Sequence, residues 1–106
     1  MKMNNIFSKV ANLLMYSGPN ADEIITDAIK NGNYFELLKE QQTTVLKVYS
    51  TTAYDIKIVD NYWYNENGEL IKQTILINNK EKVIFDKFKE AESMLLELER
   101  DLVVAS

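Results

Sequence analysis

The 106-residue chain contains no cysteine and no histidine, and it has one arginine, one proline and three glycines. Without cysteine there can be no disulfide framework and no thiol chemistry, and a reducing, cytoplasmic setting is expected. Without histidine, the commonest general base and the commonest transition-metal ligand are both missing. We therefore expect neither a zinc nor a copper site, and the calcium-loop pattern D-x-[DN]-x-[DN]-G is absent as well.

The scarcity of glycine excludes the best-known catalytic loops. The sequence has no P-loop, no G-x-G-x-x-G and no G-x-S-x-G. Asp55 and Asp60 are candidate acids or bases, because the neighbouring aromatic residues Tyr54 and Tyr62 could raise the pKa of a carboxylate. No second group lies at a diagnostic spacing from either carboxylate. The sequence therefore predicts a protein that is not an enzyme, with no catalytic residues, no metal and no cofactor.

Charge and hydropathy disfavour two classes of partner. The net charge is −4 and no basic block is present, which disfavours binding to a nucleic-acid backbone. No apolar run approaches the roughly 18 residues that a membrane span needs. The apolar stretch 1–16 is broken by Ser8, Lys9 and Asn12, and no cleavage site follows it, so we expect no signal peptide. With 46% hydrophobic residues, residues 1–106 are expected to form one domain.

The first part of the chain has the 3.6-residue apolar period of helices. This period predicts three helices, over residues 4–17, 21–31 and 34–41. Gly18 and Pro19 would end the first helix, and Asn20 is a typical N-cap for the second. A similar cap pattern at Asn33 and Glu36 predicts the start of the third helix.

From residue 43 onward, apolar and polar residues alternate as they do in β-strands. The alternation predicts strands over residues 43–49, 53–64, 70–77 and 82–85. A three-residue loop over 66–68, with Gly68 in a bulge, would pair Trp63 with Ile71 and Val59 with Ile75. A two-residue loop at Asn67-Gly68 is the alternative, but it would place Glu66 opposite Glu69, and like charges repel.

The end of the chain reads as one amphipathic helix over residues 87–102. Asp86 is its expected N-cap. The spacing predicts a buried seam of Phe88, Ala91, Leu95, Leu98 and Leu102. A rival interpretation starts this helix near Lys80 and leaves three strands. The predicted fold class is α+β: N-terminal helices, then a three- or four-stranded antiparallel meander, then a C-terminal amphipathic helix.

The second predicted strand presents large apolar side chains on both of its faces. A sheet that is covered on one side only should alternate apolar and polar residues. Either helices cover both faces, therefore, or one face meets a partner. The candidate partner-binding residues are Tyr54, Ile58, Tyr62, Tyr64 and Leu70. Because tyrosine is enriched in interface hot spots, we expect a protein partner, and a homodimer, through this hairpin.

A second candidate surface is an acidic strip on the last helix. Glu90, Glu97 and Asp101 share one face of that helix. Glu97 and Asp101 are like-charged at a spacing of four residues and lie near the helix C-terminus, where negative charge is unfavourable. Such a strip could meet a basic partner, although a solvated face would have the same pattern.

The function predicted from the sequence is a small, non-enzymatic protein-binding module. Lysine greatly outnumbers arginine, and asparagine and isoleucine are abundant, a composition associated with AT-rich genomes such as those of some phages. An inhibitor, immunity or counter-defence protein of a phage or other mobile element would fit. The alternatives are a sheet-face binder of a small ligand or single-stranded nucleic acid, or a structural subunit of a larger assembly. Tyr62 and Tyr64, with Lys57 and Lys72, would form the nucleic-acid platform.

Overall fold

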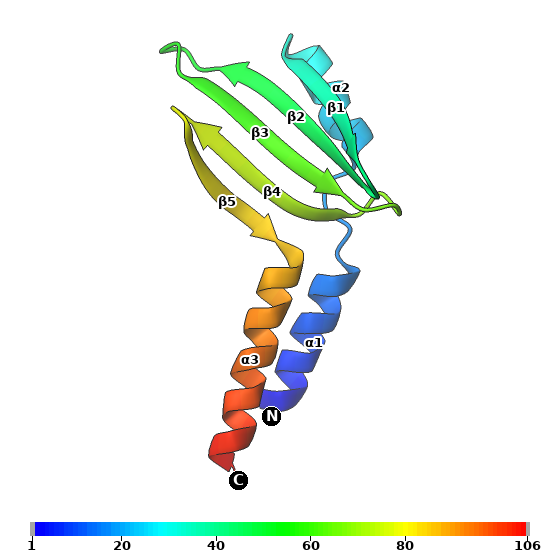
Figure 1. Cartoon of the computed structure of the whole chain (residues 1–106), viewed down its shortest axis with the longest axis vertical. Coiled ribbons are helices and arrows are strands. Elements are labelled where there is room, and N and C mark those ends of the chain that lie inside the picture. The colour runs from blue at the N-terminus through cyan, green and yellow to red at the C-terminus, as the bar shows by residue number, and fades with distance from the viewer. Residues whose placement is uncertain (1, 106) are drawn as a thin grey trace.

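A computed structural model describes residues 2–105 of the chain, and side chains for residues 5–100. The fold is α+β, as predicted, with two N-terminal helices, an antiparallel sheet and a C-terminal helix (Figure 1). The elements are α1 (Lys2–Met15), α2 (Ala21–Lys30), β1 (Tyr34–Glu40), β2 (Thr43–Thr51), β3 (Lys57–Tyr64), β4 (Leu70–Ile77), β5 (Lys80–Asp86) and α3 (Lys87–Ala105). The strand order β1-β2-β3-β4-β5 makes the sheet a simple meander.

The predicted third helix over 34–41 is wrong, because these residues form strand β1. Asn33 does not cap a helix. Its N–H donates to the Ala28 carbonyl at 2.8 Å and closes the turn over Asn31 and Gly32 that follows α2. A helix of this length is marginal by itself. As a strand, the segment pairs with β2 along its whole length, from Tyr34 opposite Tyr49 to Glu40 opposite Thr43.

The β3–β4 hairpin confirms the predicted three-residue loop but not the predicted pairing beyond it. The Asn65 N–H donates to the Glu69 carbonyl at 3.0 Å, and Gly68 has a φ of 75°. The register then shifts after Tyr64, so that Trp63 pairs with Lys72 and not with Ile71. An extra residue in one strand makes such a shift. In consequence Gln73 and Leu76 lie on the opposite faces from those predicted.

The last strand and the two remaining turns refine the predicted boundaries. Asn78 and Asn79 both have positive φ and form the turn between β4 and β5. Strand β5 follows directly, so the rival interpretation with a helix from Lys80 is wrong. The sheet has five strands and not the predicted three or four, because residues 34–40 add strand β1. Strand β3 is shorter than predicted, since residues 52–55 form a turn in which Asp55 has a φ of 59°.

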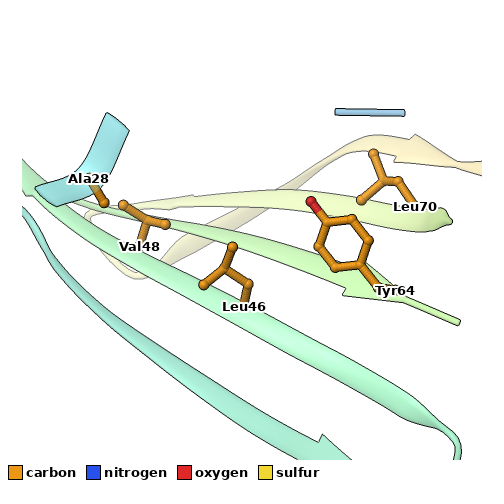
Figure 2. Close-up of a cluster of buried hydrophobic side chains, with 5 residues drawn as sticks. All are labelled: Ala28, Leu46, Val48, Tyr64 and Leu70. Carbon is orange, nitrogen blue, oxygen red and sulfur yellow. The ribbon is translucent and has the colours of Figure 1, made fainter. Parts of the chain in front are cut away.

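Helix α2 and the sheet together form the larger part of the molecule, called here the body. Asn20 caps α2 as predicted, accepting a hydrogen bond from the Asp22 N–H at 2.8 Å. The body core consists of Ala28, Leu46, Val48, Tyr64 and Leu70 (Figure 2). Half-buried side chains surround it: Ala21, Ile24, Ile25, Phe35, Tyr62 and Phe85. All the helical members of this cluster come from α2, so α2 covers one face of the sheet.

Helices α1 and α3 run antiparallel and extend beyond the end of the sheet as a separate arm (Figure 1). Asp86 caps α3 as predicted, accepting from the Lys89 N–H at 3.1 Å. The arm core consists of Ile6, Val10, Ala91 and Leu98, with Leu13 and Met94 packed against it. The predicted α3 seam is therefore only partly buried, because Phe88 and Leu95 are exposed. The side chain of Leu102 lies outside the described residues.

Candidate functional site

The face of the sheet opposite α2, called here the open face, is crossed by three rows of side chains. Strand register joins each row: Tyr34, Tyr49, Val59 and Leu76 form the first, Glu36, Lys47, Asn61 and Thr74 the second, and Leu38, Val45, Trp63 and Lys72 the third. The helix side chains that pack on the sheet lie on the other face. Among residues 2–105, only the start of α3 borders this face, beside Lys72 and Val83. The rest of the open face is left without helical cover.

The first row is aromatic at one edge of the sheet and aliphatic at its centre. The Tyr34 and Tyr49 rings lie 5.4 Å apart with a tilt of 36° between them. Together with Val59 and Leu76 they line a hollow of about 690 Å³. A hydrogen bond with the Glu36 carboxylate, and then burial, raise the pKa of the Tyr49 hydroxyl. This row offers both apolar area and phenol groups, which is the chemistry of an interface anchor.

Charged and polar groups frame this hollow. It is bounded by Asp55 from the β2–β3 connection, by Lys57 at the start of β3, and by Asn78 and Asn79 from the β4–β5 turn. Positive φ at both asparagines fixes the turn that forms this rim. An apolar floor with a few polar groups at its edge is the usual composition of a recognition pocket.

The third row places the single tryptophan beneath a lysine. Lys72 Nζ lies 5.2 Å from the centre of the Trp63 ring. Such a cation–π contact contributes about 0.5–1 kcal/mol at an exposed site. Val45, between Leu38 and Trp63 in this row, is buried by its larger neighbours. The row is a rigid apolar strip with one positive charge above it.

The middle row is polar, and its members on β3 and β4 are buried although they are polar. Asn61 Nδ2 donates to Thr74 Oγ1 at 3.2 Å, and both residues are buried. Asn61 Oδ1 is also buried, and it has no hydrogen-bond partner among the described residues. An unsatisfied buried acceptor costs about 1–3 kcal/mol. The centre of the open face therefore contains a buried acceptor that destabilises the fold. Natural proteins retain such unfavourable groups most often at functional surfaces.

The structure does not bring the five predicted partner-binding residues together on one surface. Tyr64 and Leu70 are buried in the body core and are not available to a partner. Tyr62 and Ile58 are half-buried and alternate with the open-face residues of β3, although Ile58 also lines the hollow at the end of the sheet. Tyr54 is 89% exposed, but it lies in the turn between β2 and β3. The side chains that sequence reasoning assigned to a partner mostly hold the body together.

The hydroxyl of Tyr64 shows how completely that side chain belongs to the body. It donates a hydrogen bond to the Pro19 carbonyl at 3.0 Å, and thereby holds the segment between α1 and α2 against the sheet. Burial, and secondarily the neighbouring Tyr62, raise the pKa of Tyr64 to about 12. A phenol in this setting stays protonated at any physiological pH and acts as a structural donor.

The predicted acidic strip is exposed where it is described. Glu90 and Glu97 are exposed on α3, while the side chain of Asp101 lies outside the described residues. The two candidate carboxylates of the hairpin are separated: Asp55 lies at the rim of the hollow, and Asp60 lies on the α2 side of the sheet. Burial raises the pKa of the Asp60 carboxyl. Among residues 2–105, no group of three acidic side chains could hold a metal ion.

Sequence reasoning missed Tyr34 and Tyr49, the aromatic pair of the open face. Tyr34 was assigned to a helix, which hid its pairing with β2. Tyr49 was correctly placed in a strand. Because side chains alternate along a strand, Val45 and Tyr49 were already expected to share one face. No local signal could have shown that this face lacks a helix, because that depends on where α1 and α3 pack.

Comparison with known proteins gave no match among protein-family models, curated proteins or solved structures. Evidence about function therefore comes from the geometry of the open face and the arm. No helix among residues 2–105 is long and apolar enough to span a membrane.

Proposed function

We propose that the protein is a non-enzymatic protein-binding module whose partner docks on the open face. The observation that carries this proposal is an aromatic and aliphatic row, Tyr34, Tyr49, Val59 and Leu76, on a sheet face that no helix of the described chain covers. A sheet in a folded domain normally buries apolar side chains against a second layer. A partner that supplied this layer would remove the row from water.

The composition of the open face suits a protein partner. Tyrosine and tryptophan supply large contact area at a low cost in side-chain entropy, and they dominate interface energetics. Glu36 and Lys47 lie between the two apolar rows, Lys72 ends the third row, and Asp55 and Lys57 lie at the rim of the hollow. Charges of both signs beside apolar rows favour one orientation of the partner over others.

Within this class, we propose a role as an inhibitor, immunity or counter-defence protein of a phage or other mobile element. The support is compositional: lysine dominates over arginine, and the chain is small and lacks histidine and cysteine. Such proteins act in the cytoplasm by covering a surface of their target, a task that needs contact area and no catalytic group.

The experiment is a pull-down from extracts of the native host with the double variant Tyr34→Ser/Tyr49→Ser. Both rings lie on the open face, and neither belongs to the body core. We expect the variant to lose a partner that the wild-type protein retains, by roughly 30-fold or more in affinity, because hot-spot residues contribute at least about 2 kcal/mol. Its far-UV circular dichroism should match that of the wild-type protein.

Tyr54→Ser is the matched control. It removes the same kind of ring from a fully exposed turn outside the three rows, so it should leave binding unchanged. Equal retention of the partner by the double variant and the wild-type protein would contradict the proposal. Loss of binding in Tyr54→Ser alone would place the partner on the β2–β3 turn.

A second candidate function is binding of a small ligand in the hollow. Its volume of about 690 Å³ lies within the roughly 300–1,000 Å³ of ligand sites. Trp63 is the only tryptophan and lies on the same face, so ligand entry should change its fluorescence. The same Tyr34→Ser/Tyr49→Ser variant should abolish that change. Salt-sensitive retention on single-stranded DNA would instead favour nucleic acid.

A further inference from the structure

The arm carries a second apolar seam that its own two helices do not bury. Four large side chains form this exposed seam: Phe7 is 53% exposed, Leu14 44%, Phe88 60% and Leu95 46%. In each helix the two residues are seven positions apart, so they lie on one line along the helix. A seven-residue apolar spacing is the usual pattern of a helix that packs against another helix.

The exposed seams of α1 and α3 lie on the same side of the arm. At 3.6 residues per turn, each seam lies about a quarter-turn around its helix from the buried seam. The buried seams of the two helices face each other. Because the helices are antiparallel (Figure 1), residue numbers viewed from one end advance clockwise around one helix and anticlockwise around the other. A quarter-turn from each buried seam therefore leads to the same side of the arm. Lys9, Glu90 and Glu97 fall on the opposite side, which is charged.

The shape of the monomer shows that the arm lacks a packing layer. The Cα radius of gyration is 17.3 Å, whereas a compact domain of this length has a radius of about 13 Å. Much of the excess is the arm, which extends the longest dimension to 56 Å. Two helices by themselves bury only the line along which they touch, so stable helical units add further helices.

We infer that the exposed seam is a dimerisation surface, on which the arm of a second copy of this chain completes an antiparallel four-helix bundle. A two-fold axis parallel to the helices would place α1 of each copy against α3 of the other. Every adjacent pair of helices would then be antiparallel, as in four-helix bundles. The interface is self-complementary because both copies present the same seam.

Charge complementarity favours a second copy whose α3 packs on α1. Helix α1 contains two lysines and no acidic residue, whereas α3 contains five acidic and three basic residues. Glu92 and Glu99 flank the exposed seam on α3 and are both exposed. Packing α3 on α3 would bring these carboxylates of the two copies together. Packing α3 on the acid-free α1 of the second copy avoids that repulsion.

The exposed seam supplies about half of the area that a standard dimer interface needs. Aromatic side chains bury on the order of 150–250 Å² each, so two phenylalanines and two somewhat smaller leucines that are about half exposed offer on the order of 400 Å² per copy. A standard interface buries about 800 Å² per partner. The exposed seam supplies about half of this from its centre, and the flanking helix surface would supply the polar rim.

This dimer differs from the one expected from the sequence, which used the hairpin. The hairpin rings Tyr62 and Tyr64 belong to the α2 side of the sheet, while the arm projects away from the sheet. The inference is thus independent of the proposed function, and a failure of one leaves the other standing.

The first test is the solution mass of the full chain, measured by light scattering and sedimentation from low to high micromolar concentration. We expect twice the chain mass of 12.3 kDa at the upper end of this range. The double variant Phe7→Glu/Leu95→Glu should be a monomer with unchanged circular dichroism, its dimer dissociation constant raised roughly 100-fold or more, because it places charges in the centre of the seam. A wild-type monomer throughout would overturn the inference.

Leu96→Glu is the matched control. Leu96 is as exposed as the seam residues, at 52%, but it points about a quarter-turn away from the seam on α3. This variant should remain a dimer, as should Tyr34→Ser/Tyr49→Ser. A monomeric Leu96→Glu, or a dimeric seam variant, would mean that the copies associate through another surface.

Because the chain has no cysteine, single-cysteine variants test the arrangement directly and do not depend on disrupting the fold. Phe7→Cys and Leu95→Cys proteins, mixed and oxidised, should form a disulfide mainly with each other. Dominant self-linking of Leu95→Cys would show α3 packed on α3 and would overturn the arrangement we infer.

Discussion

The body and the arm bury their apolar side chains to different depths. In the body, Leu46 and Leu70 are 0% and 1% exposed, whereas in the arm Ala91 and Leu98 are each 6% exposed and have large exposed neighbours. The body has two layers, a sheet and a helix, which enclose side chains from several directions. The arm is a single layer of two helices. The comparison indicates that the body can complete its own core, while the arm depends on an additional layer.

The largest expected effect comes from truncating the same residue type in both regions. Leu46→Ala should lower the free energy of unfolding by about 2–5 kcal/mol, because the side chain is fully enclosed and leaves a cavity. Leu98→Ala should lower the free energy of unfolding by an amount at or below the lower end of that range, because the arm core is shallow and can collapse around the truncated side chain. Urea titration followed by circular dichroism measures both. Equal losses would remove the distinction between body and arm.

The junction between the two regions should show the next largest effect. Gly18 has a φ of +72°, and an added Cβ would lie 2.6 Å from Leu70 Cβ. The adjacent Ser17 carbonyl accepts from the Leu70 N–H at 2.8 Å, which fixes the approach. Gly18→Ala should therefore lower the free energy of unfolding by about 2–4 kcal/mol, from backbone strain and overlap together.

Gly68→Ala separates those two causes. Gly68 has a φ of +75° with nothing within 4 Å of an added Cβ, so this variant contains the backbone strain without the overlap. It should cost about 1–2 kcal/mol, measured by the same titration. If Gly18→Ala cost no more than Gly68→Ala, the junction would be looser than the structure places it.

The smallest expected effect concerns the part of the body where a carboxylate is half-buried. Burial raises the pKa of Asp60 above its ordinary value of 3.8, so the folded protein binds this proton more tightly than the unfolded chain does. The protonated form stabilises the fold at pH below 3.8, and this stability is lost as the pH rises through the raised pKa. Asp60→Asn should accordingly be more stable than the wild-type protein at neutral pH, and equally stable at low pH.

The measurement for Asp60 is a set of urea titrations across acidic to neutral pH. Asp55→Asn, in an exposed turn, controls for the loss of one negative charge. A stability difference between Asp60→Asn and the wild-type protein that did not shrink toward low pH would show that ionisation of Asp60 is not its cause.

Local signals in the sequence placed most elements correctly. Asn20 and Asp86 act as the predicted helix caps, and Gly68 lies in the predicted hairpin loop with a φ of 75°. Strand β4 has the predicted bounds, 70–77. These features depend on a few neighbouring residues and their hydrogen bonds, so a short stretch of sequence contains the information.

The candidate site was predicted less well, for a physical reason. The aromatic residues of β3 were identified as important, yet Tyr62 and Tyr64 face the body core. Which face of a strand meets a helix depends on the register and on the path of distant segments. The register shift beside Tyr64 arises from a single extra residue in one strand. The Tyr64 hydrogen bond to Pro19 joins residues far apart in the chain. Neither feature has a local signature in the sequence.

The sequence by itself determined the α+β class, most of the helix caps and turns, and the amphipathic character of the terminal helices. Only the tertiary structure decided that 34–40 is a strand, that α2 covers one sheet face, and that α1 and α3 leave Phe7, Leu14, Phe88 and Leu95 exposed. An apolar stripe predicts that one face of a helix or strand is buried. Which element buries it depends on contacts between residues distant in the chain. Hydrogen bonds in turns are local, and burial is not.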